Sequence, residues 1–148
     1  DERYRKAGMY FDHQEFGGHY YRPMSAWALL NALLGLAIDD GRLEFAPKLP
    51  EDNQKLFFSF GQGTAHYVRK VTSRAEEISI EVRTGALDCS ELSLALQTKD
   101  AGRVRIHCAG KQLAASAYSA EFSGKQLALT LKRPLKVRAD KALRIRVS

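Results

Sequence analysis

The sequence has few of the residues that build metal sites and disulfide scaffolds. Its 148 residues include two cysteines and four histidines. No Cys-x-x-Cys pair and no Cys/His set with zinc spacing is present, so we expect no metal. Disulfide-dependent small domains usually carry more cysteines than this. We therefore favour two free thiols, at Cys89 and Cys108, over one disulfide.

A membrane-spanning run and a secretion signal are also missing. The apolar stretch at residues 24–37 has 14 residues and contains Asn31, whereas a span needs about 20 apolar residues. The chain opens on DERYRK, which is charged rather than apolar, and this opening assigns no compartment. The motifs GxGxxG, GxxxxGK[ST], HExxH and GxSxG are absent, and we expect no cofactor.

The net charge of +6 is concentrated in the second half of the chain. Residues 75–148 hold 13 Lys/Arg and 8 Asp/Glu, whereas residues 1–74 hold 10 and 9. A basic half is one feature of nucleic-acid-binding proteins. Here, however, the bases alternate with apolar residues, as in RVRI and LRIRV, and no aromatic stacking platform accompanies them. This pattern is typical of the solvated face of a strand, so we expect no nucleic-acid partner.

One segment has the pattern of a helix that is apolar on almost every side. Pro23 suits the first turn and Gly35 suits the end. Between them only Ser25 and Asn31 interrupt the apolar residues. Such a helix needs cover on most of its faces, more than one small sheet gives. The segment therefore predicts a long buried helix, covered by an upstream part of the same protein or by another copy. Its apolar positions are Met24, Trp27, Ala28, Leu29, Leu30, Ala32, Leu33 and Leu34.

The remainder of the chain has the pattern of a β-sandwich. Apolar and polar residues alternate from Lys55 to Val147, and turn signals recur every 8–12 residues. We predict about eight or nine antiparallel strands there, in a chain of the α+β class that is mostly β. The Pro-rich stretch APKLPEDNQ marks the predicted boundary, with residues 1–50 in a helical domain and residues 51–148 in the sandwich. We also predict a turn at residues 37–41, a strand at residues 113–117 and a strand end at Pro134.

The candidate chemistry lies just before the helix, in the stretch HQEFGGHYYR. Arg22 stands at the entry to the helix, where the helix dipole disfavours a cation. We therefore expect a specific interaction of its guanidinium. It either aims its donors at sugar hydroxyls or a carboxylate, or forms a buried ion pair with Asp12 or Glu15. We predict a substrate-binding set of Arg22, Glu15, His19 and Tyr21. The set contains no catalytic residue, because neighbouring carboxylates in one loop are usually solvated.

Residues 19–50 resemble the end of the catalytic region in glycoside hydrolase family 116. This family includes bacterial β-glucosidases and non-lysosomal glucosylceramidases. The resemblance rests on Tyr20-Tyr21-Arg22-Pro23, on the Trp27-bearing helix and on Pro47-Lys48-Leu49-Pro50. It implies that the helix is the last inner helix of an (α/α)6 barrel and that Arg22 contacts the substrate. It also implies a retaining glycosidase whose glutamate nucleophile and aspartate acid/base lie upstream, so that this fragment alone is inactive.

The sequence departs from the family before the arginine. The glucosylceramidases carry Glu-Ala-Trp there, whereas this chain has Gln14-Glu15-Phe16-Gly17-Gly18. The alternative function is a stand-alone carbohydrate- or protein-binding β-sandwich whose helix merely covers one sheet. That alternative predicts a helix covered by this chain's own strands. The barrel interpretation predicts an open flank at Ala28, Leu29 and Ala32, with a carbohydrate as the substrate.

Overall fold

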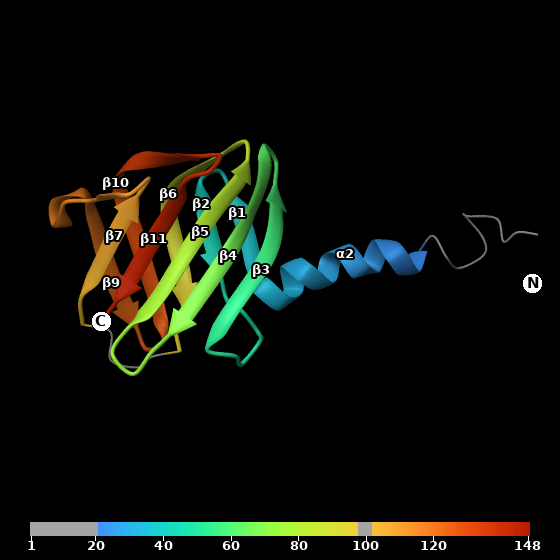
Figure 1. Cartoon of the computed structure of the whole chain (residues 1–148), viewed down its shortest axis with the longest axis horizontal. Helices are drawn as coiled ribbons and strands as arrows, with labels where there is room; N and C mark the ends of the chain where they lie inside the picture. The colour runs from blue at the N-terminus through green and yellow to red at the C-terminus, as the bar shows by residue number, and fades with distance from the viewer. Residues whose placement is uncertain (1–20, 98–101) are drawn as a thin grey trace, which may run out of the picture.

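The computed structural model describes residues 21–97 and 102–148, and gives the backbone alone for residues 21–27. The described residues form one α-helix, eleven strands and one 3₁₀ turn. Figure 1 shows their arrangement. The elements are α2 (Tyr21–Leu34), β1 (Leu36–Asp39), β2 (Arg42–Phe45), β3 (Asn53–Phe60), β4 (Gly63–Val71), β5 (Glu76–Thr84), β6 (Ala86–Ala95), β7 (Val104–Cys108), β8 (Lys111–Gln112), η1 (Ala115–Ala117), β9 (Tyr118–Ser123), β10 (Gln126–Arg138) and β11 (Ala142–Val147).

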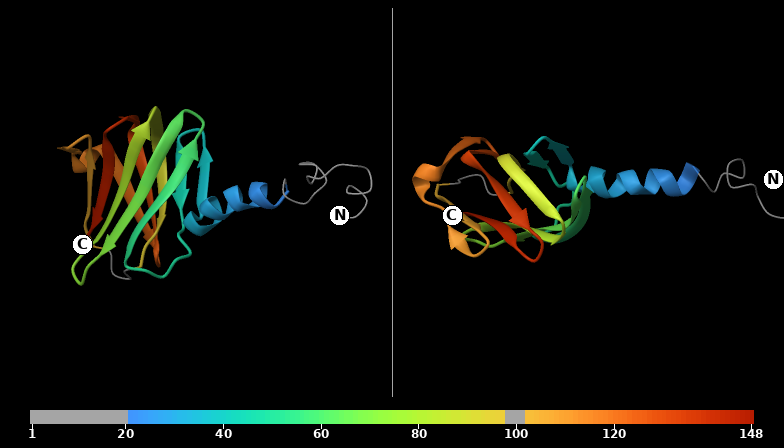
Figure 2. Two further views of the ribbon diagram at one scale, coloured as in Figure 1. Left: turned by 45° about the vertical axis from the view of Figure 1, so that its right-hand side comes forward. Right: turned by 90° about the horizontal axis from the view of Figure 1, so that it is seen from above.

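The strands form two sheets that face each other, as the view from above in Figure 2 shows. The first sheet has the order β1-β2-β6-β10-β9, and the second has the order β3-β4-β5-β11-β7-β8. The predicted sandwich is therefore confirmed, with nine strands from β3 to β11. All pairings among these nine strands are antiparallel, as predicted. The strand β2 precedes the predicted sandwich, and it joins the first sheet by pairing with β6 in parallel.

The core lies between the sheets and is built from buried residues of most strands, whereas β1, β8 and β9 contain no buried residue. The predicted row Ile78, Ile80 and Val82 is buried, as is the row Leu127, Leu129 and Leu131. Such alternation follows from the period of two along a strand. At the end nearest α2, the ring of Phe45 stacks on Tyr67 at 5.0 Å and meets Phe58 edge-on at 5.4 Å. Phe45 belongs to the first sheet and the other two rings to the second, so the rings join the two sheets there.

The segment predicted as a turn at residues 37–41 is a tight hairpin. Leu36–Asp39 pairs with Arg42–Phe45, and Asp40 and Gly41 between them both have positive φ. Two positive φ values in a two-residue loop suit the twist of the flanking strands. Strands β1 and β2 belong to the same sheet as β6, although they precede residue 50. The boundary between two domains at that residue stays a prediction.

Two other strand predictions are wrong. Residues 115–117 form the 3₁₀ turn η1 rather than a strand, and the chain pairs again only in β9. Pro134 does not end its strand, because β10 continues to Arg138. The register of β10 against β6 shifts between Thr130 and Leu135. Such an irregularity admits a proline, since no ladder N–H is needed from it there.

Candidate functional site

The structure leaves the predicted substrate-binding set untested. Glu15 and His19 lie outside the described residues. Tyr21 and Arg22 lie in the first turn of α2, where the backbone alone is described. The helix thus begins two residues before Pro23 and ends at Leu34, close to the predicted bounds. The roles of all four residues stay predictions.

The helix α2 projects from one end of the sandwich, as Figure 1 shows. Residues 28–32 are exposed, and the exposed fraction is 60% for Leu29 and 43% for Leu30. Leu33 is half-buried, and only Leu34 is fully buried in the described part of the helix. The strands of this chain therefore do not bury the helix, and the expectation that an upstream part or another copy covers it stays a prediction. The predicted open flank at Ala28, Leu29 and Ala32 is present.

Exposed apolar side chains gather on the elements at this end of the molecule. The described residues include five large exposed hydrophobic side chains. Two lie on α2, and one each on β1 and β3, which are edge strands of the two sheets. The helix contacts both of these strands. We call α2, β1 and β3 the helix end. The exposed side chains are Leu29, Leu30, Ile38 and Phe57 at the helix end, and Phe122 on β9.

Backbone hydrogen bonds tie the C-terminus of α2 to the sandwich. The amide of Ala46 donates to the carbonyls of Leu34 and Gly35, at 3.2 and 3.1 Å, and the amide of Lys48 donates to Leu33 at 2.8 Å. These donors satisfy carbonyls that a helix end leaves without partners. Gly35 has a φ of +56°, and a side chain there would meet the carbonyl oxygen of Ala46. The close approach therefore requires glycine.

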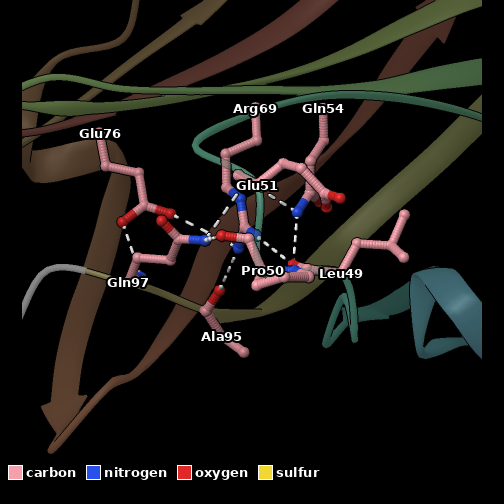
Figure 3. Close-up of polar contacts among 8 residues, drawn as sticks. All are labelled: Leu49, Pro50, Glu51, Gln54, Arg69, Glu76, Ala95 and Gln97. Carbon is pink, nitrogen blue, oxygen red and sulfur yellow. Dashed lines mark hydrogen bonds and ion pairs between the residues drawn. The ribbon is translucent and has the colours of Figure 1, made fainter.

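The segment that follows, residues 46–52, is held by side-chain amides, as Figure 3 shows. Gln54 donates from Nε2 to the carbonyls of Leu49 at 2.6 Å and Glu51 at 2.9 Å. Gln97, two residues after β6, donates to the carbonyls of Pro50 at 3.3 Å and Glu51 at 3.4 Å. We call residues 46–52 the connector. It is tied to the helix at one end and to both sheets at the other.

A buried ion pair lies beneath the connector. Arg69 on β4 is 2% exposed, Glu76 on β5 is fully buried, and the distance between Nη1 and Oε1 is 3.9 Å. Arg69 also donates to the carbonyls of Leu49 and Ala95, each at 3.5 Å. The other carboxylate oxygen of Glu76 accepts the backbone N–H of Gln97 at 2.9 Å. Buried charges persist when they are paired and hydrogen-bonded in this way.

The sequence contains a pattern that predicts this cluster, two charged residues at inward positions of neighbouring strands. Arg69 continues the inward row of Ala65 and Tyr67, and Glu76 begins the inward row of Ile78 and Ile80. A charged residue in the apolar register of a strand points into the core. Two such residues of opposite sign on neighbouring strands predict a buried pair.

Several site types are absent from the part of the chain that the structure describes. In residues 21–97 and 102–148, no group of three or more His, Cys, Asp or Glu side chains could hold a metal ion. Over the same residues, no helix has the length and apolarity that a bilayer crossing requires. Cys89 and Cys108 are both free, as we favoured. Burial raises the pKa of the Cys89 thiol to about 12, so this thiol is not a nucleophile at neutral pH.

Comparison with known proteins shows no family. No family model matches the chain, and no curated protein matches it. Among solved structures, the chain is similar to an α-L-rhamnosidase from Dictyoglumus thermophilum, with 10% identity and a TM-score of 0.44. The match covers 78% of this chain and 12% of the rhamnosidase, so the chain corresponds to a small part of that enzyme's length. A similarity at this level does not bear on the activity of the chain.

Proposed function

We propose that this chain is an accessory β-sandwich of a glycoside hydrolase, and that α2 packs against helices of the catalytic region. The observation that carries the proposal is the exposed stretch Ala28–Ala32, which is apolar apart from Asn31. Each leucine side chain transferred from water into an apolar interface contributes about 1.5–3 kcal/mol. The resemblance of residues 19–50 to family 116 supports a glycosidase as the enzyme.

The distribution of the apolar residues favours a partner made of several helices. Successive residues of an α-helix are about 100° apart, so residues 28, 29, 30 and 32 cover an arc of about 200° on the surface of α2. A single sheet covers one face of a helix, whereas neighbouring helices cover several. The helix carries no acidic residue in its first turn and no basic residue in its last. An apolar helical partner fits this surface better than a charged one.

The geometry of α2 gives Arg22 a position away from the sandwich. At 1.5 Å per residue, Arg22 lies about 18 Å along the axis from Leu34. The helix end that carries Tyr21 and Arg22 would therefore lie inside the helical region. In this arrangement Arg22, with Glu15, His19 and Tyr21, contacts the sugar next to the cleaved bond. The catalytic carboxylates come from the helical region, and the sandwich fixes the axis of α2.

The test compares one substitution in two settings. Leu30→Glu is made in the 148-residue chain and in the longest natural form of the protein. In the chain alone we expect an unchanged free energy of unfolding, because this side chain already contacts water. In the longer protein we expect a lower melting temperature and a loss of hydrolysis of aryl β-glucosides, because a carboxylate would enter an apolar interface.

Phe122→Glu is the matched control, since Phe122 is 38% exposed and lies on β9, away from the helix end. It should change neither melting temperature nor hydrolysis in the longer protein. If Leu30→Glu changes neither the melting temperature nor the hydrolysis by the longer protein, the docking of α2 is contradicted. Turnover of aryl β-glucosides by the 148-residue chain alone contradicts the proposal that the catalytic carboxylates come from the helical region. If the 148 residues prove to be the whole natural protein, the stand-alone binding module is favoured instead.

A further inference from the structure

The outer face of the second sheet carries a polar hollow. Its volume is about 470 Å³, within the range of small-molecule sites. The pairing register places Val68, Ser79, Arg144 and His107 side by side across four strands, β4, β5, β11 and β7. All four residues line the hollow. Charged side chains also line the hollow, and they are Lys70, Glu77, Glu81 and Arg146.

Two cations of this hollow are without acidic partners among the described residues. Arg146 pairs with Glu77 at 2.9 Å, and Glu81 pairs with Arg83 at 3.5 Å. Arg144 and Lys70 line the same hollow, and neither is in an ion pair with a described residue. The hollow therefore offers a guanidinium fork whose hydrogen-bonding capacity is unused by the described protein residues.

Groups that suit hydroxyls lie beside this guanidinium. Ser79 Oγ is shielded from solvent and has no hydrogen-bond partner in the described structure. His107 and the carboxylate of Glu81 line the same hollow. Together these groups suit a ligand with one carboxylate and several hydroxyls.

A second hollow continues the first. Its volume is about 420 Å³, and it shares Glu81, Gly110 and Arg144 with the first hollow. Arg83 and Lys141 add two further cations, and Asp140 adds one acid. Arg144 thus stands where the two hollows meet. A chain of linked sugar units can occupy both while one acidic unit contacts Arg144.

The lining chemistry selects among possible ligands. Neither hollow is lined by a Phe, Tyr or Trp side chain. Neutral sugars and single-stranded nucleic acids are both commonly held by stacking on aromatic rings. A carboxylate, by contrast, matches the arginine fork, and hydroxyls match the acids around it.

We propose that this double hollow binds an acidic oligosaccharide, with the carboxylate of a uronate unit held by Arg144. The site lies on the outer face of the second sheet and uses no residue of α2. It is therefore independent of the proposed docking of the helix, and either proposal can fail without the other.

The experiment is a calorimetric titration of the 148-residue chain with trigalacturonate, with neutral cellotriose and with sulfate as comparison probes. We expect trigalacturonate to bind and cellotriose to bind far more weakly. Arg144→Gln should weaken trigalacturonate at least about tenfold, because hydrogen bonds to charged groups contribute strongly. Arg144 is exposed, so the urea midpoint of the variant should match that of the natural chain.

Lys132→Gln is the matched control, because Lys132 is an exposed cation on β10 of the other sheet. It should change the affinity less than about twofold, as expected for a distant, independent site. The proposal is overturned if trigalacturonate fails to bind at about 10 mM, a concentration that detects weak sites. It is also overturned if sulfate or cellotriose binds as well as trigalacturonate, or if Lys132→Gln weakens binding as much as Arg144→Gln.

Discussion

Replacing Glu76 by glutamine tests the role of the buried ion pair most directly. Glutamine keeps an oxygen that can accept the amide of Gln97, but it removes the counter-charge of Arg69. Arg69 is 2% exposed, and its guanidinium would remain charged without a carboxylate beside it. Breaking a buried pair in this way costs about 3–5 kcal/mol. Domains of this size have about 5–15 kcal/mol of stability in total.

The neighbouring residue provides the control. Glu77 follows Glu76 on β5 but points to the outer face, where its carboxylate lies 2.9 Å from Arg146 and is 52% exposed. This distance is shorter than the 3.9 Å of the buried pair. Exposed pairs nevertheless contribute only about 0–1 kcal/mol. If burial rather than distance decides the magnitude, Glu77→Gln should cost far less than Glu76→Gln.

Urea unfolding followed by far-UV circular dichroism measures both variants. For a urea dependence of about 2 kcal/mol per molar, Glu76→Gln should lower the midpoint by about 2 M and Glu77→Gln by less than about 0.5 M. Hydrogen exchange of the Lys48 amide should also become faster in Glu76→Gln, because the connector loses part of its support. Equal midpoints for the two variants, or a loss below about 1 kcal/mol for Glu76→Gln, would refute the reasoning.

Two further substitutions test the helix attachment and the core by urea unfolding. Gly35→Ala should destabilise the chain more than Gly124→Ala. The φ values of the two glycines are alike, +56° and +58°, but of the two only Gly35 would place a Cβ against another atom, the carbonyl oxygen of Ala46. Equal losses would show that backbone strain alone, about 1–2 kcal/mol, sets the cost. Burial raises the pKa of Cys89 from 9.0 to about 12, so the unfolded chain loses this proton first as the pH rises. Stability should therefore fall by about 1.4 kcal/mol per pH unit between pH 9 and pH 12 in the natural chain. Cys89→Val should remove this component, and parallel pH profiles of the two proteins would contradict it.

The strands of the second half could be predicted because their pattern is local. Ile78, Ile80 and Val82 recur with the period of a strand, and each proves to be buried. A one-residue shift would turn all of them outward, so the pattern fixes the face of the strand. The pattern does not determine which strand pairs with which. The parallel pairing of β2 with β6 joins residues 42–45 to residues 91–94, and no local signal of residues 42–45 specifies it.

The hairpin and the helix show two other limits of the sequence. In β1, Ala37 and Ile38 are exposed, so backbone pairing with β2 rather than burial makes this segment a strand. An alternating apolar pattern could not predict it. The apolar character of α2 was correctly identified from Ala28, Leu29 and Leu30, but it predicts that cover is needed, not which chain supplies it. The N-terminal candidates around Glu15 remain predictions, since they lie outside the described residues.

The position of the ion pair explains why a costly pair of charges lies inside this sandwich. Apolar residues of the same size could fill the space and leave the stability of the domain similar, but their side chains cannot form hydrogen bonds. Arg69 and Glu76 contact the carbonyl of Leu49 and the amide of Gln97, and Gln97 in turn holds the carbonyls of Pro50 and Glu51. The connector has no strand partner of its own at these carbonyls, so side chains must satisfy them. A fixed connector holds the amides of Ala46 and Lys48 at the end of α2, and the axis of the projecting helix is thereby set by charges buried in the sandwich.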